Sequence, residues 1–190
     1  MGRQKRMPTL WEVSDDLWER IEKLIDEYDP PASTGRKRED GRKIINALIF
    51  RIRTGCQWNH LPKVYGDDST IHRTFQRWVE IGLCEMIWSL LVAECDELGL
   101  VEWDWQSADG SLGKAHGGGA EIGPNPTDRA QSGSKKSLLV DGQGRPLSIV
   151  LAAANVNDHT LLEETIESII VARPEPTDEE PQNLRPRWWL

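Results

Sequence analysis

One carboxylate stands out by its place in the chain. Asp109 ends a run of alternating residues that begins at Val101. In a strand, alternate residues share one face, and here that face would carry Val101, Trp103, Trp105, Ser107 and Asp109. Gly110 is expected to end the strand. A carboxylate at the end of a buried strand could hold a catalytic metal ion, while an Asp-Gly-Ser turn is the plainer reading.

A second group of candidate residues lies on a predicted helix between Ser69, as its N-cap, and about Ile81. Its predicted inner stripe consists of Ile71, Phe75, Trp78 and Val79. The polar side chains outside this stripe, with one lysine of the preceding loop, suit contacts to phosphates and base edges: Lys63, Thr70, His72, Arg73, Gln76 and Arg77. A wet face of an ordinary helix bundle is the alternative to DNA binding.

Further helices are predicted before and after this one. Ser14 is expected to cap a helix that ends before Pro30-Pro31, and a second helix should run from about Arg42 to Thr54, with Gly55 as its stop. A short helical turn follows at 57–61. A helix that ends at Gly55, a short second piece and a third helix with an Arg/His/Gln/Thr outer face resemble a helix-turn-helix. Another amphipathic helix is expected from Cys84 to Leu98.

The second half of the sequence predicts strands and then a helix. A hairpin is expected from 136–140 and 146–152, joined by a glycine turn in which Asp141 is structural, with a supporting role at a site left open. Asp158 or Thr160 should cap the helix that follows. The basic run Arg36-Lys37-Arg38 is either a solvated loop or a phosphate contact.

The overall charge is acidic but unevenly distributed. The chain has 190 residues and a net charge of −8. Residues 1–82 hold 15 Lys and Arg against 13 Asp and Glu, whereas residues 83–190 hold 8 against 18. DNA contacts are therefore expected in the first half. No apolar run is long enough for a membrane span, and the N-terminus lacks the core of a signal peptide, so a cytoplasmic protein without membrane contact is expected.

The three cysteines predict no disulfide framework. Cys56, Cys84 and Cys95 are widely spaced and are expected to be reduced thiols. A zinc site of Cys56, His60, His72 and Cys84 is conceivable, but the spacing fits no standard zinc finger.

Several passages resemble DDE transposases of the insertion-sequence-five family. They begin with Cys56-Gln57-Trp58-x-x-Leu61-Pro62, the stretch from Ser69 to Trp78, and Ala108-Asp109-Gly110-Ser111. They continue with residues 123–129, Leu138-Leu139-Val140-Asp141-Gly142 and residues 153–158. The resemblance covers nearly the whole chain. It implies an α+β protein with a helix-turn-helix-like N-terminal domain and a truncated RNase H-like domain of three antiparallel strands and a helix.

The resemblance also implies a chemistry. Such enzymes hold two divalent metal ions, Mg²⁺ or Mn²⁺, on two aspartates and a glutamate, and they cut and join DNA at transposon ends. Asp109 matches the first aspartate. The second should follow the 159–171 helix in an Asp-x-x-Tyr-Asp passage, and the glutamate should follow later. Neither is expected in this chain, so it should be inactive alone.

The tryptophans near the C-terminus suggest where the missing passage lies. Arg187-Trp188-Trp189-Leu190-stop can be written CGA TGG TGG CTA TGA, and one nucleotide later it reads Asp-Gly-Gly-Tyr-Asp/Glu. The two glycines are forced by the tryptophan codons, whereas the other codons are one choice among synonyms. The chain is therefore expected to be the upstream frame of a split transposase gene, joined by programmed frameshifting or disabled.

The expected organisation is a helical DNA-binding domain at 1–99, a partial catalytic domain at 100–172 and a disordered tail at 173–190, out of frame at its end. The expected DNA partner is the terminal inverted repeat of the element, and the expected protein partner is a second copy of the chain or the product of the downstream frame. Two alternatives remain open: a non-catalytic regulator or inhibitor of transposition, and a nonfunctional fragment with an exposed strand edge.

Overall fold

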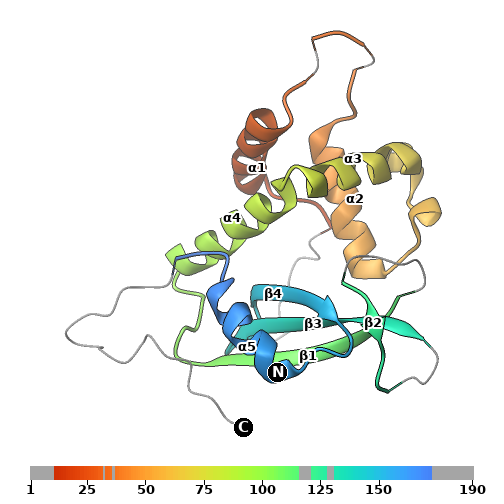
Figure 1. Ribbon diagram of the computed structural model, residues 1–190. Coiled ribbons are helices and arrows are strands. Elements are labelled where there is room, and N and C mark those ends of the chain that lie inside the picture. The colour runs from red at the N-terminus through yellow and green to blue at the C-terminus, as the bar shows by residue number, and fades with distance from the viewer. Residues whose placement is uncertain (1–10, 32, 36, 116–120, 128–130, 173–190) are drawn as a thin grey trace, which may run out of the picture. The chain divides into compact units, whose positions relative to one another are not determined.

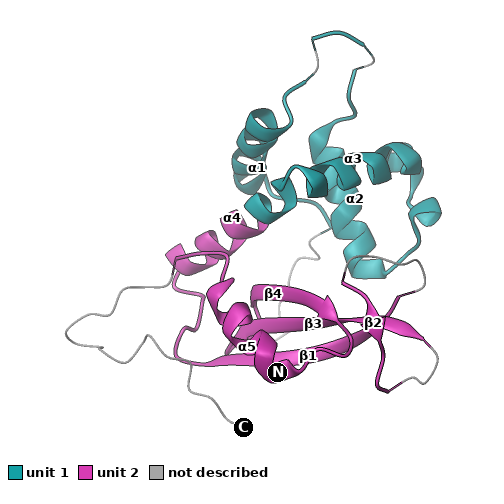
Figure 2. Ribbon diagram, in the orientation of Figure 1, with its two compact units in different colours: residues 1–87 teal, residues 88–190 magenta. Residues whose placement is uncertain are grey.

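The computed structural model describes residues 11–31, 33–35, 37–115, 121–127 and 131–172. The predicted tail at 173–190, Arg36 and parts of the glycine-rich loop lie outside these residues. The chain divides into two compact units, residues 1–87 and 88–190 (Figure 2). The division falls inside one helix. Helices precede strands, and the predicted α+β class is confirmed (Figure 1).

The first unit is built from helices with well-defined ends. Helix α1 spans Asp15–Tyr28, and its N-cap Ser14 accepts a hydrogen bond from the Leu17 N–H, as predicted. Helix α2 spans Gly41–Thr54 and ends at Gly55, whose φ of 66° is the left-handed conformation that glycine adopts without strain. Two 3₁₀ turns follow, η1 at Trp58–His60 and η2 at Lys63–Tyr65.

Helix α3 spans Asp68–Glu80, and two details of its prediction were wrong. Its N-cap is Asp67, so Ser69 lies within the first turn. Asp67 takes the position because its carboxylate accepts hydrogen bonds from both the backbone and the hydroxyl of Thr70. The buried residues are Ile71, Thr74 and Trp78, while Val79 is 52% exposed. The buried face of α3 therefore includes Thr74 and not Val79, so it is rotated about the helix axis relative to the predicted stripe.

The core of the first unit is aliphatic with one large aromatic side chain. Its buried apolar members come from the helices and from the segments beside them: Val13, Ile21, Ile44, Ile45, Ala47, Leu61, Ile71, Trp78 and Leu83. One buried polar group, Asn46, accepts a hydrogen bond from the Val13 N–H. Burial of this set supplies the main force that holds the helices together.

Helix α4 (Leu83–Glu97) leads into the second unit, an antiparallel sheet. The strands are β1 (Gln106–Lys114), β2 (Gly123–Pro124), β3 (Ser132–Asp141) and β4 (Pro146–Ala153). Strand β3 is central: β1 pairs along one edge, and β4 and the short β2 pair on it as well. The predicted hairpin is confirmed as β3 and β4.

Helix α5 (Asp158–Glu167) packs on one face of this sheet (Figure 1). Its N-cap is Asn157, whose side chain accepts from the His159 N–H, so the expectation that Asp158 or Thr160 caps the helix was wrong. A buried chain of hydroxyls holds it to the sheet, since the Thr165 hydroxyl donates to Ser137 Oγ at 2.7 Å. A separate apolar cluster, formed by Val92, Val101, Leu139 and Leu147, lies where α4 meets the strands.

The first strand was predicted too early in the chain. β1 begins at Gln106 and runs past Gly110 to Lys114. Residues 101–105 are instead an irregular segment, in which Val101 enters the apolar cluster and the Trp103 indole N–H donates to Asp96 Oδ1 at 2.6 Å. Val101 and Trp103 alternate here because both pack beside α4, while Trp105 is 45% exposed, so this alternation does not mark a strand.

Candidate functional site

The exposed side of α3 carries two of the predicted DNA-contact residues. Arg73 and Gln76 are exposed and lie three positions apart, and therefore close together on the helix surface. The Arg73 Nε donates to the carbonyl of Ser69 at 3.2 Å. The opposite side of α3 is the buried face with Ile71, Thr74 and Trp78. One cation and one amide are thus presented to solvent by a helix whose other side is firmly docked.

The start of α3 is acidic. Lys63 forms an ion pair with Asp68, with 3.1 Å between Nζ and Oδ1. Hydrogen bonds from the backbone and the hydroxyl of Thr70 hold the pKa of Asp67 below its ordinary value, so Asp67 is negative at neutral pH. Lys63 and Thr70 therefore already have acidic partners. A helix N-terminus is ordinarily a favourable position for a phosphate. Here the carboxylates of Asp67 and Asp68 would repel one.

His72 lies on one flank of the exposed side and stacks on an indole. Its ring centroid is 4.5 Å from that of Trp58, with 23° between the planes. Trp58 belongs to η1, and its ring centroid is also 5.5 Å from that of Phe75. The zinc site of Cys56, His60, His72 and Cys84, which the spacing did not favour, gains no support, because no cluster of three metal-binding side chains occurs in the described residues. The three cysteines are free thiols, as predicted.

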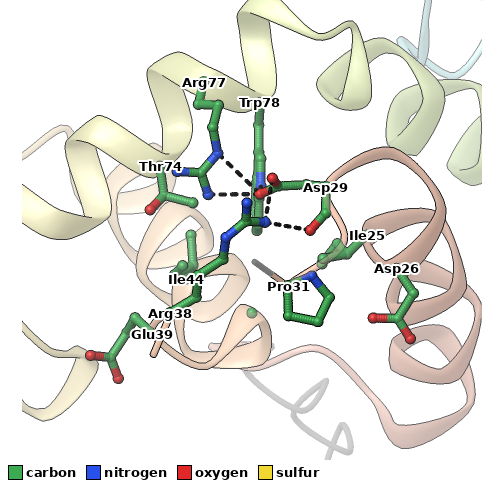
Figure 3. A pocket seen from close by; sticks show the side chains of 11 residues that line it. Ile25, Asp26, Asp29, Pro31, Arg38, Glu39, Ile44, Thr74, Arg77 and Trp78 are labelled. Carbon is green, nitrogen blue, oxygen red and sulfur yellow. Dashed lines mark hydrogen bonds and ion pairs between the residues drawn. The ribbon is translucent and has the colours of Figure 1, made fainter. Parts of the chain in front are cut away.

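Arg77 lies on the other flank and is bound to a buried carboxylate. Its Nε and Nη2 donate to Asp29 Oδ2 at 3.1 and 2.7 Å. The Trp78 indole N–H donates to the same oxygen at 2.9 Å, and Arg38 binds Oδ1 (Figure 3). Asp29 is only 7% exposed, beside a cavity of about 160 Å³. Arg77 thus anchors α3 to the end of α1.

The charge state of Asp29 follows from these partners. Burial by itself raises the pKa of this carboxyl, but hydrogen bonds from Arg77 and Trp78 and the positive charges of Arg77 and Arg38 outweigh it. The pKa lies below its ordinary value. Asp29 is therefore an ionised, buried carboxylate that three side chains share.

Asp109 lies in the middle of β1, opposite Leu138 of β3, and is exposed. The neighbouring residue Gly110 faces α5, since a Cβ there would come within 2.6 Å of Asp158 Oδ1. Asp109 therefore points to the face of the sheet that α5 leaves uncovered. Among the described residues no group of three potential metal ligands surrounds it. One carboxylate does not make a metal site, so these residues alone do not fit a two-metal centre.

Asp141, expected to be structural, is the most completely bonded carboxylate of the second unit. It is 2% exposed and accepts from the backbone N–H groups of Arg145, Gln143 and Glu102 at 2.7, 3.0 and 3.2 Å. The Arg145 guanidinium adds an ion pair at 3.2 Å. Asp141 thereby closes the β3–β4 turn and holds the segment before β1. It belongs to the fold and not to the exposed face of Asp109.

Residues 13–88 match the family described as "Putative transposase of IS4/5 family (DUF4096)". The uncharacterized protein y4sN of Sinorhizobium fredii is 30% identical over 106 residues, which cover 55% of this chain and 77% of that protein. The chain belongs to the IS4/5 transposase family. The predicted relation to insertion-sequence transposases is thus confirmed.

Two Burkholderia cepacia proteins relate this family member to one insertion element. The "Insertion element IS402 uncharacterized 16.2 kDa protein" is 27% identical over 60% of this chain and 80% of its own length. The "Putative transposase for insertion sequence element IS402" is 50% identical over 52 residues, which cover 27% of this chain and 25% of that protein. No solved structure matches the chain.

The family match covers most of the first unit. It contains α3 with its exposed side chains and the Asp29 carboxylate, while Asp109 lies beyond it. The sequence reading missed Asp29, which it passed over at the end of α1. The sequence does place this acid directly before two prolines and a basic run, which could have marked it as a partner for a cation. Its partner Arg77, however, is 48 positions away. Arg38 of that basic run is bound to this acid and is not a plain solvated cation.

Proposed function

We propose that this transposase-family chain binds duplex DNA at the ends of an insertion sequence through the exposed side of α3. The observation that carries the proposal is the docking of α3 by Ile71, Thr74 and Trp78, which leaves Arg73 and Gln76 exposed. Arginine and glutamine are the side chains that pair with guanine and adenine edges in the major groove. A DNA-recognition helix needs one side that packs on the protein and an opposite side, here called the reading side, that contacts the bases.

The remaining predicted contacts take different roles in this proposal. His72 lies on the flank of the exposed side and suits a backbone phosphate, whereas Lys63, paired with Asp68, supports the start of α3. Thr70, whose hydroxyl is bound to Asp67, supports the start of α3. Arg77 orients the helix through Asp29 and does not touch DNA. In this proposal α2, η1 and α3 bind DNA in the manner of a helix-turn-helix. The expected location of such a protein is the cytoplasm.

Replacement of both Arg73 and Gln76 by alanine should weaken DNA binding. For the variant Arg73→Ala/Gln76→Ala we expect a loss of at least about tenfold in affinity for the terminal inverted repeat, because each base contact contributes about 1–3 kcal/mol. Fluorescence anisotropy at several salt concentrations measures this, with a scrambled duplex as reference. Lys23→Ala, which removes an exposed cation of α1, is the control and should bind as the unaltered chain does. Equal binding by the double variant would remove α3 as the reading helix.

We further propose that Asp109 is the first metal ligand of a DDE site whose other ligands are encoded in the downstream frame. Its exposure on the open face of the sheet and its position on β1 support this role. Mg²⁺ or Mn²⁺ would be the cofactor of the completed enzyme, and this chain alone is expected not to cut DNA, because a single carboxylate cannot hold two ions.

The frame-restored protein tests the role of Asp109. Asp109→Asn should abolish Mg²⁺- or Mn²⁺-dependent cleavage of DNA that carries the element's ends, while binding of that DNA persists. Asp104→Asn, an exposed acid just before β1, is the matched control and should cut normally. Cleavage by the Asp109 variant at the unaltered rate would show that the metal is held elsewhere.

A further inference from the structure

Arg51 differs from the arginines that form ion pairs. Arg38, Arg42, Arg77 and Arg145 each bind a carboxylate. Arg51, in the last turn of α2, lies over the Trp58 ring, with 4.1 Å between its guanidinium carbon and the ring centroid. Its Nε is buried and has no hydrogen-bond partner among the described residues. An aromatic ring thus holds this cation in place, and no carboxylate of the described part of the chain forms an ion pair with it.

Trp58 links this cation to the proposed reading helix. The same indole that carries the Arg51 guanidinium stacks on His72 of α3 at 4.5 Å. Arg51 therefore lies beyond the His72 flank of α3 and extends the basic surface onto α2. Since Arg51, His72 and Phe75 already contact Trp58, the indole is a support for side chains and not a bare platform for a nucleic-acid base.

The charges around α3 indicate where a phosphate contact could form. A DNA-reading helix must be fixed on the duplex by contacts to backbone phosphates, which carry most of the affinity. The usual phosphate position at the helix N-terminus is opposed here by Asp67 and Asp68. Arg77, on the far flank, is held by its hydrogen bonds to Asp29 and is not free to reach DNA. The Trp58 flank, where Arg51 is, has neither of these two features.

We propose that Arg51, oriented by Trp58, binds a backbone phosphate of duplex DNA next to the bases that α3 reads. The inference rests on the proposed DNA binding by α3 and adds a contact from a different helix. A planar guanidinium whose orientation is fixed by stacking donates two hydrogen bonds to a phosphate without further ordering. As a phosphate contact, Arg51 contributes to affinity for every sequence and not to the choice between sequences.

Arg51→Gln in the full chain is the decisive variant. Glutamine keeps a flat polar group on this side chain, two bonds closer to the backbone than the guanidinium, and removes the charge. We expect binding to weaken about five- to tenfold at roughly 100 mM salt, equally for the terminal inverted repeat and a scrambled duplex, and the slope of log K against log salt to fall by about one. Lys43→Ala removes one charge from the other end of α2 and should leave affinity and slope unchanged.

The possible outcomes separate this proposal from the one it rests on. If Arg73→Ala/Gln76→Ala loses affinity while Arg51→Gln keeps the original affinity and slope, only the phosphate contact is wrong. A loss for the inverted repeat alone would make Arg51 a base-reading residue and would also overturn it. A fall in helical circular dichroism or thermal stability for Arg51→Gln would assign Arg51 to the fold. If the unaltered chain binds no duplex DNA, both proposals fail.

Discussion

Asp29→Ala should lower the free energy of unfolding of the first unit by about 3 kcal/mol. The substitution leaves Arg38, Arg77 and the Trp78 indole facing a site that no longer holds a carboxylate. Loss of one partner of a buried ion pair typically costs about 3–5 kcal/mol. The low end applies here because the two guanidinium groups are 36% and 38% exposed, so solvent screens part of their charge.

The effect of Asp29 depends on pH with a defined sign. Because the pKa of Asp29 is lowered in the folded chain, its stabilising contribution is fully present above the ordinary value of 3.8. It is lost as the pH falls through the lower, folded-state pKa. The difference between the unaltered chain and Asp29→Ala should therefore be constant near pH 7 and shrink below about pH 4.

Urea unfolding followed by circular dichroism and tryptophan fluorescence measures this difference. Asp26→Ala, which removes an exposed acid that lines the same cavity, is the matched control and should change stability by less than about 0.5 kcal/mol. A loss for Asp29→Ala no greater than for this control would show that the two arginines are held by other contacts. The DNA affinity of Asp29→Ala should fall with its stability, since α3 loses its anchor to α1.

Asp141→Ala should destabilise the second unit by a similar amount, roughly 3 kcal/mol or more. Three backbone N–H groups and one guanidinium lose their acceptor, and an unpaired buried donor costs about 1–3 kcal/mol. Burial raises the pKa of Asp141, but the hydrogen bonds from Arg145, Glu102 and Gln143 lower it further than burial raises it. This contribution too is present at neutral pH and lost in acid.

Thermal unfolding of Asp141→Ala beside Asp104→Ala gives the measurement and its control. Asp104 is an exposed acid of the same irregular segment that Asp141 holds through Glu102. Asp141→Asn should recover little stability, because the amide presents an NH₂ group towards donors. If Asp141→Ala melts at the temperature of the control, water replaces the carboxylate in the turn.

Two helix boundaries, at Ser14 and Gly55, could be predicted from the sequence, whereas the N-caps of α3 and α5 could not. Ser14 and Gly55 end their helices through contacts within a few residues, so the local sequence carries the whole signal. The start of β1 was missed because Trp103 is held by Asp96 of α4, and alternation alone does not distinguish such packing from a strand. The partner of Arg77 was missed for a related reason. A helical pattern separates inside from outside, but it does not identify an acid at the end of another helix.

The candidate site could be predicted in part. Arg73 and Gln76 followed from the outer face of one helix, which periodicity reveals. Arg51 did not, because its position depends on Trp58 of a separate turn, and helical periodicity does not reveal such a contact. The role of Asp109 as a metal ligand came from the family resemblance and stays a prediction.

The boundary between the two units lies inside α4, between Ile87 and Trp88. A fragment that ends at the boundary would keep only the first turn of that helix, too short to persist in water. A fragment that keeps the whole helix would expose Trp88 and Val92, which pack against the second unit. Recombination between family members at this boundary would therefore break a helix, so the two halves are expected to be exchanged only together with compatible residues on both sides of α4.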